Sequence, residues 1–288
     1  MSSVSVREAL PRDTPRMLEL TRNVWDGSDY VPSSWETWLQ DAQGELWVAE
    51  LDGRVVGLQH AALQPDASVW LEGIRVDEEV QGRGIGSVLL RHAVDWSRKM
   101  GVRAIRLSTY SENQASNAMA ERQGLRLVGT FSAMTARADN SASGWPSQTR
   151  LAMPWESSEI LQFLEHSGWQ PFSGCYSEGW TAYVLSRDRL RLLLSMHAVL
   201  LAGDAEIEAV AIASSAIKRS AIRLGLLTGS SDGCQSLCRR LRSQASELGL
   251  REVRATLELD RELQQVVLDE GFAIGDGCML LRELRLDE

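Results

Sequence analysis

Two periods of apolar and polar positions follow one another along the first half of the chain. Stretches in which every second residue is apolar are typical of half-buried strands, and stretches with a 3.6-residue apolar period are typical of helices that face a core. These patterns predict strands at residues 4–10, 45–51, 54–63, 68–76, 104–110 and 125–137, and helices at 13–25, 34–41, 84–100 and 114–123. Because short turns separate the early strands, we expect an α/β (α+β) fold with a mixed, mainly antiparallel central sheet flanked by helices.

The same order of patterns returns in the second half of the chain. Three pairs of segments match in their apolar and polar order: 7–20 with 150–163, 48–57 with 200–209, and 100–129 with 248–275. The offset between matching positions drifts along the chain, as insertions in loops would cause. We therefore predict two tandem copies of one α/β unit.

A small, polar segment at 138–148 is the predicted boundary between the two copies. It divides the chain into a first domain at 1–145 and a second domain at 146–288. Besides the last strand predicted for the first copy, two segments of the second half stay open as sources of the strand that closes the first sheet, namely 149–153 and 179–186.

Composition restricts the class of protein. The chain of 288 residues is 44% hydrophobic and 24% charged, as in soluble globular proteins, and its net charge of −9 argues against a nucleic-acid partner. Its apolar runs are too short to span a bilayer, and the N-terminus lacks the apolar core of a signal peptide. We therefore expect a cytoplasmic protein with no membrane partner, and leave open whether it forms a homodimer.

Cysteine and histidine positions do not suggest a metal site. The four cysteines all fall in the second half, and the four histidines are scattered, so that no zinc-like spacing arises. Cys234 and Cys238 are four residues apart and would share one face of a helix. We predict buried, reduced thiols and no bound metal.

Three glycines at every second position stand at the start of the helix predicted at 84–100. Gly82, Gly84 and Gly86 leave the backbone bare where the N–H groups of a helix point outward, and such groups bind phosphate or pyrophosphate. Residues 75–106 carry seven basic and four acidic side chains within an acidic chain. The alternative interpretation is a tight turn followed by a solvated helix face.

Two other phosphate-binding loops do not fit this segment. Gly86 is followed by Ser87 and Val88, whereas a P-loop has a Lys-Ser or Lys-Thr pair after its last glycine. The spacing G-x-G-x-G also differs from the dinucleotide fingerprint G-x-G-x-x-G, and the next strand has no acid at its tip in the right register.

The segment Q-G-R-G-I-G at 81–86 resembles the Q/R-x-x-G-x-G/A motif of the GNAT acyltransferase superfamily. The flanking residues agree, with I-R-V on the preceding strand and N-x-x-S…G-L at 113–125. The resemblance implies acetyl-CoA as co-substrate, with N–H groups of the loop on the pyrophosphate and the backbone of the preceding strand along the pantetheine arm and the thioester. The residues it assigns to acetyl-CoA are Ile74, Arg75, Val76, Gln81, Gly82, Arg83, Gly84, Ile85, Gly86, Ser87, Asn113 and Ser116.

The second copy lacks a corresponding loop. When Gly101 is matched with Gly249, the three glycines fall on Ser230, Asp232 and Cys234. A carboxylate within a pyrophosphate site would repel the ligand. We therefore predict a degenerate second domain with a structural or pocket-forming role.

Acetyl transfer needs a base for the amine and a proton for the departing thiolate. Glu72 lies within the apolar strand pattern WLEGIRV, where a buried charge is costly unless it is paired or reactive, so we predict it as the general base. A strand-edge salt bridge is the alternative. GNAT enzymes often have a tyrosine seven residues after the position of Asn113, which here is Ala120, so Tyr110 is the predicted acid and Tyr30 the second choice.

In GNAT proteins the segment between the first two helices lines the acceptor side, and it reads NVWDGSDYVPSSWETWL here. Flat apolar walls and negative charge for a cation make Trp25, Asp26, Asp29 and Tyr30 the predicted acceptor residues. The alternative is that the aromatic side chains belong to the core and the aspartates cap helices. GSDYVPSSWETWL and WLEGIRV also resemble the subgroup of histidine N-acetyltransferases, which have a degenerate second half.

These features together predict an N-acetyltransferase that moves an acetyl group from acetyl-CoA directly to the primary amine of a small molecule. The α-amine of an amino acid is the first choice of acceptor. One alternative is a non-catalytic protein that binds acyl-CoA or a partner, and another is a protein N-terminal or aminoglycoside acetyltransferase.

Overall fold

The computed structural model describes residues 4–139, 148–167, 174–216 and 221–286. The chain forms two compact units that are not consecutive in sequence: unit 1 is Met1–Leu107, Asn113–Leu127 and Arg282–Glu288, and unit 2 is Ser108–Glu112 and Val128–Leu281. Most of the segment predicted as the domain boundary lies outside the described residues.

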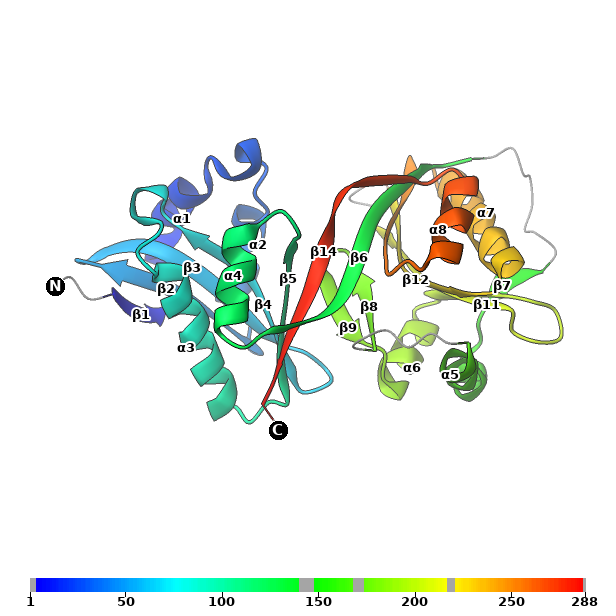
Figure 1. The fold of residues 1–288 in the computed structure, drawn as a ribbon, viewed down its shortest axis with the longest axis horizontal. Helices are drawn as coiled ribbons and strands as arrows, with labels where there is room; N and C mark the ends of the chain where they lie inside the picture. The colour runs from blue at the N-terminus through cyan, green and yellow to red at the C-terminus, as the bar shows by residue number, and fades with distance from the viewer. Residues whose placement is uncertain (1–3, 140–147, 168–173, 217–220, 287–288) are drawn as a thin grey trace. The chain divides into compact units, whose positions relative to one another are not determined.

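Unit 1 contains the elements predicted for the first copy except its last strand (Figure 1). Its helices are α1 (Thr14–Thr21), α2 (Val31–Leu39), α3 (Ile85–Lys99) and α4 (Gln114–Arg122), and its strands are β1 (Val4–Glu8), β2 (Gly44–Leu51), β3 (Arg54–Leu63), β4 (Ser68–Val76) and β5 (Ala104–Tyr110), of which the last three residues belong to unit 2. The strands from β1 to β4 pair antiparallel in chain order, and β5 joins β4 in parallel. The predicted mixed, mainly antiparallel sheet is confirmed.

Alternation along the strands separates two cores in unit 1. On one face, Trp47 and Ala49 of β2 pack with Leu89 of α3. On the other face, the intervening Val48 packs with Met17 of α1 and with the tryptophans of α2. Helices therefore cover both faces of this sheet, and the start of α3 is fixed against the strands by its buried side.

The strand that closes the sheet of unit 1 comes from the end of the chain. Glu283 of β14 (Ala273–Arg285) accepts a hydrogen bond from Nε of Arg106 on β5 at 2.7 Å, and both side chains are buried. The N–H of Leu286 donates to the carbonyl of Arg103 at 2.9 Å. Residues 282–286 thus belong to the fold of unit 1.

The strand predicted at 125–137 forms, but it does not close the first sheet. Strand β6 (Arg126–Arg137) pairs antiparallel with β13 (Glu252–Leu257) in unit 2. The two segments that were left open are also excluded, because Thr149–Leu151 (β7) pairs with β10 (Val199–Ala202) and Thr181–Val184 (β9) pairs with Cys175–Glu178 (β8). An alternating pattern predicts that a segment is a strand, but it does not show which other strand pairs with it in the sheet.

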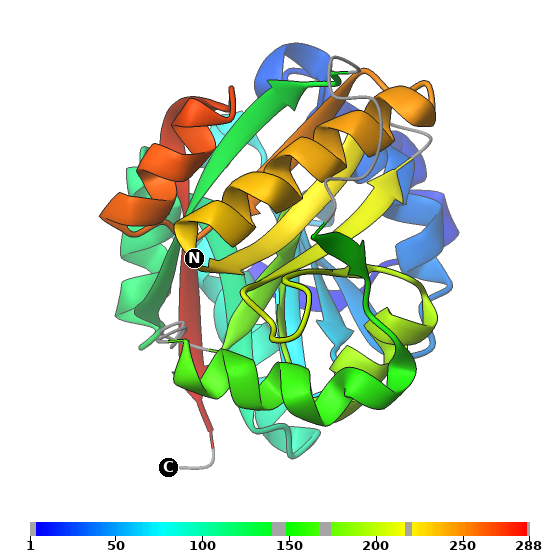
Figure 2. The same ribbon diagram turned by 90° about the vertical axis from the view of Figure 1, so that its right-hand side faces the viewer.

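Unit 2 repeats the order of elements seen in unit 1. Its remaining elements are α5 (Ser157–His166), α6 (Arg187–Ser195), β11 (Ala209–Ala216), β12 (Ala221–Gly229), α7 (Ser231–Glu247) and α8 (Arg261–Asp269). The strand order is β14-β6-β13-β12-β11-β10-β7, and Figure 2 shows α7 lying across these strands. Among the described residues of unit 1, the hairpin of β8 and β9 between α5 and α6 has no counterpart.

Candidate active site

A β-bulge interrupts the pairing of β3 and β4. Leu58 lies opposite Arg75 and His60 opposite Glu72, so that β4 has one residue more than β3 across this interval. Gly73 lies in the bulge with φ +70°, and a Cβ there would be 2.6 Å from the ring of Trp38. The bulge bends the strand and re-aims the residues after it, and glycine is required both by the conformation and by the tryptophan.

Strands β4 and β5 separate shortly beyond their start. Their parallel pairing runs from Ser68–Ala104 to Trp70–Arg106, whereas β4 continues to Val76. One edge of β4 from Leu71 onward is therefore left with backbone groups that a ligand can pair. This is the stretch to which the resemblance assigned Ile74 and Val76, although the carbonyl of Ile74 already accepts a bond from Nη1 of Arg75 at 2.8 Å.

The glycine loop leads from the end of β4 into α3. Gly82 and Gly84 have φ of +77° and +81°, and a Cβ at either position would meet nothing within 4 Å. Gly84 is the N-cap of α3, and the N–H groups of Ile85, Gly86 and Ser87 in the first turn have no acceptor within the helix. Residues 81–84 are exposed. The predicted residues from Gln81 to Ser87 thus form one open helix N-terminus, as pyrophosphate binding requires.

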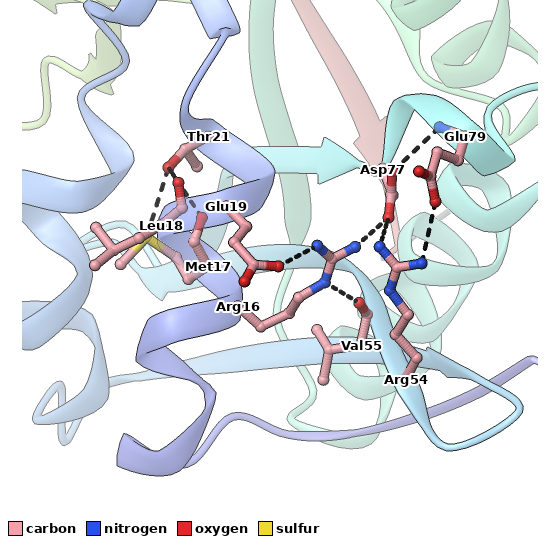
Figure 3. Close-up of polar contacts among 9 residues, drawn as sticks. All are labelled: Arg16, Met17, Leu18, Glu19, Thr21, Arg54, Val55, Asp77 and Glu79. Atoms are coloured by element: carbon pink, nitrogen blue, oxygen red, sulfur yellow. Dashed lines mark hydrogen bonds and ion pairs between the residues drawn. The ribbon is translucent and has the colours of Figure 1, made fainter.

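An arginine network fixes the start of this loop (Figure 3). Asp77, the first residue after β4, is bonded by Arg16 of α1 and lies 3.3 Å from Nη2 of Arg54 of β3. Arg54 also bonds Glu79 at 3.0 Å, and Nε of Arg16 donates to the carbonyl of Val55 at 2.9 Å. The network ties the loop to both neighbouring elements, and it neutralises a carboxylate that would otherwise repel an anion at the loop.

The second side of the predicted acetyl-CoA site is the start of α4. The Asn113 side chain accepts the N–H of Ser116 at 3.1 Å and so caps the helix. Gly86 of α3 faces Met119 of α4, whose sulfur would be 3.0 Å from a Cβ at the glycine. The two helices therefore approach closely at the loop, and Asn113 serves first as a helix cap.

Glu72 lies in a polar cluster that the sequence did not reveal. Its Oε1 is 3.2 Å from Nδ1 of His60, and Nε2 of that histidine is 3.4 Å from Oδ2 of Asp41. The His60 ring stacks on Trp38 with centroids 4.7 Å apart. The Glu72 side chain is 25% exposed, whereas that of His60 is 2% exposed. The carboxylate is thus accessible and oriented from behind by the imidazole.

Sequence reasoning missed His60 because it counted the histidines only as scattered potential ligands. One signal was present, since His60 is a polar residue in the apolar strand segment RVVGLQHAAL. Its partner could not be derived, because the bulge shifts the register by one residue between Leu58 and His60.

The predicted acceptor residues lie close together, but two of them are engaged. Both carboxylate oxygens of Asp29 accept bonds from Arg75, at 2.8 and 2.7 Å, and the Asp29 side chain is 1% exposed. The Tyr30 hydroxyl accepts the N–H of Gly73 at 3.0 Å, and burial is the main cause that raises the pKa of Tyr30 to about 12. Asp29 therefore balances Arg75 rather than offering a free charge.

Trp25 and Asp26 are exposed and lie outside the α-helices, in the short 3-10 segment Val24–Gly27. Helix α1 ends at Thr21 rather than at residue 25, because Trp25 and Asp26 have φ of +49° and +53°, which an α-helix cannot include. The guanidinium of Arg75 lies 4.8 Å from the centre of the Trp25 ring, a cation–π contact. Of the four predicted acceptor residues, these two remain open to a ligand.

Tyr110 at the end of β5 groups with unit 2, whereas Glu72 belongs to unit 1. Its ring packs edge-on against Trp180 with centroids 4.3 Å apart, and Oγ of Ser108 donates to the carbonyl of Trp180 at 2.8 Å. Burial raises the pKa of the Tyr110 hydroxyl. The residue as a whole is 40% exposed. Its role as an acid stays a prediction.

Three absences can be stated for the part of the chain that the structure describes. None of its helices is long and apolar enough to cross a membrane. No group of three or more His, Cys, Asp and Glu side chains in that part is placed to hold a metal ion. Disulfides are also absent among these residues, and Cys175, Cys234 and Cys238 are buried as predicted while Cys278 is partly exposed.

Known proteins with a similar sequence are acetyltransferases. Residues 6–125 match the model of the acetyltransferase (GNAT) family. A histidine N-acetyltransferase from Oreochromis niloticus is 30% identical over 103 residues, which are 35% of this chain and 31% of that protein. An aminoglycoside N(6')-acetyltransferase type 1 from Stenotrophomonas maltophilia is 28% identical over 126 residues, which are 41% of this chain and 82% of that protein.

The chain spans only 25–31% of the length of the histidine N-acetyltransferases that it matches. The similarity in fold covers more of the chain than the similarity in sequence. The crystal structure of a GCN5-related N-acetyltransferase from Sphaerobacter thermophilus aligns with 98% of this chain and 95% of its own, with a TM-score of 0.67 and 16% identity. This likeness shows that nearly the whole chain has the fold of that protein.

Proposed function

We propose that the chain, whose residues 6–125 match the model of the acetyltransferase (GNAT) family, transfers an acetyl group from acetyl-CoA to the primary amine of a small molecule. We propose further that the acceptor is the α-amine of an amino acid. The second domain, in this proposal, holds no acetyl-CoA of its own.

One observation carries the proposal. The open N-terminus of α3 lies beside the unpaired edge of β4, since a Cβ at Gly86 would be 3.7 Å from Val76, so that a site for pyrophosphate and a strand edge for an extended amide-bearing chain are adjacent in unit 1. Acetyl-CoA combines these two chemical features. The residues present therefore fit this co-substrate.

Glu72 would act as the base at the end of that edge. The attacking amine must be neutral, so a carboxylate that takes its proton enables attack on the thioester carbon. Backbone N–H groups between Ile74 and Val76 would donate to the carbonyl oxygen as negative charge develops there. The thiolate that leaves would take its proton from solvent.

The acceptor class rests on the surroundings of Glu72. Trp25 offers an exposed aromatic face, and Asp26 an exposed carboxylate, next to the pair of Asp29 and Arg75. Such a site suits a small, positively charged amine with an apolar part. Similarity to histidine N-acetyltransferases supports an amino acid.

Release of the CoA thiol from acetyl-CoA in the presence of candidate acceptors tests this function. The panel contains free amino acids, polyamines, aminoglycosides and short peptides, and mass spectrometry identifies the acetylated product. We expect turnover with amino acids. Turnover with aminoglycosides or peptides alone would overturn the acceptor assignment, and binding of acetyl-CoA without turnover would support a non-catalytic acyl-CoA-binding protein.

A further inference from the structure

The Tyr30 hydroxyl uses only one of its two hydrogen-bonding functions. Its oxygen accepts the N–H of Gly73 at 3.0 Å, at the bulge in β4. Its own proton makes no bond to an acceptor among the residues that the structure describes. A tyrosine hydroxyl can accept and donate at the same time. Because Tyr30 is only half-buried, a bound ligand can take the bond that this proton offers.

Packing fixes the position of this hydroxyl. Tyr30 directly precedes α2, and its carbonyl accepts the N–H groups of Ser33 and Ser34 at 3.1 and 3.2 Å. The ring stands edge-on to Trp38 with centroids 6.0 Å apart, and it stacks on Trp25 at 6.1 Å. The hydroxyl is therefore oriented by the fold itself, which is what a preorganised donor requires.

The direction of the backbone groups beyond the bulge follows from one bond to β3. The N–H of Asp77 donates to the carbonyl of Val56 at 2.9 Å. Backbone groups point alternately to the two sides of a strand. The N–H and C=O groups of Ile74 and Val76 therefore point to the other side, which is the unpaired edge of β4.

This edge presents donors rather than acceptors. The carbonyl of Ile74 accepts a bond from Nη1 of Arg75 at 2.8 Å, and that of Val76 accepts one from Nε2 of Gln81 at 3.1 Å. The two N–H groups of the edge thus remain for a ligand. One of them belongs to Ile74, the residue that follows Gly73, so that it comes directly after the residue to which Tyr30 is bonded.

The proposed base lies on the other side of the bulge glycine. Burial first and the charge of Glu72 second raise the pKa of Tyr30 to about 12, so the carboxylate and the hydroxyl are close together. A phenol of this pKa is a weaker acid than a thiol, whose ordinary pKa is about 8.5. The hydroxyl therefore keeps its proton when a thiolate leaves, and it can act only as a hydrogen-bond donor.

We infer that Tyr30 is a catalytic residue whose hydroxyl donates a hydrogen bond to the acetyl carbonyl oxygen, beside the N–H of Ile74. The inference rests on the proposed function. As the amine nitrogen bonds to the carbonyl carbon, the π electron pair moves onto the oxygen, and the amine proton goes to Glu72. The pair returns as the carbon–sulfur bond breaks, and the thiolate takes a proton from solvent. Tyr30 keeps its proton throughout.

This role explains why the bulge and the tyrosine occur together. The bond from Gly73 makes the hydroxyl a better donor, because hydrogen bonds in a chain polarise one another. The next residue, Ile74, supplies a second donor from the backbone. Two fixed donors in a half-buried site stabilise negative charge on an oxygen more than water does.

Tyr30→Phe tests the inference, because it keeps the ring and its stacking but removes the donor. We expect kcat to fall about a hundredfold while the KM for acetyl-CoA stays within about twofold, since this bond is strongest in the transition state. Ring fluorination makes a phenol a stronger donor and a weaker acceptor, so 3-fluorotyrosine at position 30 should raise kcat. A tyrosine needed only to accept the Gly73 N–H would not give this increase. Tyr183→Phe in unit 2 is the control with unchanged kcat.

Infrared spectroscopy gives a readout that does not depend on turnover. The carbonyl stretch of bound acetyl-CoA, isotope-labelled at the acetyl carbonyl, should lie at a lower frequency in the wild type than in Tyr30→Phe, because a hydrogen bond to the oxygen weakens the C=O bond. An equal stretching frequency in the two proteins would overturn the inference. Thermal unfolding shows whether Tyr30→Phe keeps its fold, and if it does not, the fluorotyrosine protein decides.

The results for the wild type separate the inference from the proposed function. A wild-type chain that transfers no acetyl group to any acceptor overturns the proposed function and the inference with it. An active wild type whose Tyr30→Phe variant turns over at the same rate overturns only the role of the hydroxyl.

Discussion

At the scale of single residues, the three loop glycines are needed for different reasons. Gly82 and Gly84 have open space around them and are required by their positive φ, whereas Gly86 is crowded by Met119. The alternation in the sequence predicted an anion loop, but it did not reveal this difference. Glu72 likewise could be predicted from its strand pattern, whereas its pairing with His60 depends on neighbours that the pattern does not reveal.

Gly84 allows charge at the loop to be tested separately from backbone strain. Gly84→Asp and Gly84→Asn place side chains of equal size at φ +81° in open space. We expect the aspartate variant to bind acetyl-CoA at least tenfold more weakly than the asparagine variant, because one charge pair at about 4 Å is worth roughly 1 kcal/mol in water and pyrophosphate carries two charges. Calorimetry measures both affinities. Equal affinities would contradict an anion site at this position.

We expect Glu258 to make the stability of unit 2 depend on pH. Burial raises the pKa of this half-buried carboxyl to about 7 from its ordinary 4.5. The folded state therefore holds the proton more tightly, so the stabilisation is complete below about pH 4.5 and is lost as the pH rises through 7. We expect Glu258→Gln to be more stable than the wild type by about 1.5 kcal/mol near pH 8, a value reduced for partial exposure, and about equal near pH 5.

Urea unfolding at the two pH values measures this difference. The exposed Glu165→Gln is the control and should behave like the wild type at both. A Glu258→Gln variant with the pH dependence of the wild type would show that another group is responsible.

At the scale of elements, local patterns were sufficient to predict whether a segment of unit 1 is a strand or a helix. They were not sufficient to predict which strand closes the sheet of unit 1 beside β5. Arg106 and Glu283 are 177 residues apart in sequence, and nothing in either segment announces the other. The arginine in the strand pattern AIRLSTY indicates at most that some carboxylate lies near, since a buried guanidinium needs one, and it does not say which one.

The last strand should stabilise unit 1 through this buried pair. Glu283→Gln keeps the shape but removes the charge, and Asp66 still contacts Arg106 at 2.7 Å. We expect a loss of about 2–3 kcal/mol in the free energy of unfolding, somewhat less than for a fully broken buried pair. Glu121→Gln is the matched control, because its partner Arg282 lies on the same strand but Glu121 is 61% exposed; there we expect less than about 1 kcal/mol. Similar losses in both variants would refute the role of the buried pair.

At the scale of the whole chain, the two units share one architecture, but the strand edge that is open in unit 1 is covered in unit 2. In unit 2, β12 and β13 pair in parallel from Ala221–Glu252 to Leu224–Ala255 and β12 then continues to Gly229, as β4 does in unit 1. A Cβ at Gly225 in that continuation would overlap the carbonyl of Ser177 in β8, and Oγ of Ser177 donates to the carbonyl of Thr256 at 2.7 Å. The chain's own hairpin therefore lies where unit 1 leaves a strand edge unpaired.

This arrangement predicts one acetyl-CoA per chain. The hairpin covers the edge, and the loop before α7 has Ser230 as its N-cap, bonded to the N–H of Gly233 at 3.1 Å, in place of a glycine with positive φ. Isothermal titration should give a stoichiometry of one, and Gly84→Asp should remove that single binding event. A second site that survives in this variant would contradict the prediction.

Turnover of Glu72→Gln at saturating acetyl-CoA and acceptor tests the central claim most directly, with the exposed Glu36→Gln as the control. If Glu72 is the base of an acetyltransferase, kcat falls by about a hundredfold or more while the Kd of acetyl-CoA stays within about twofold of the wild type. Wild-type turnover in Glu72→Gln would contradict the account.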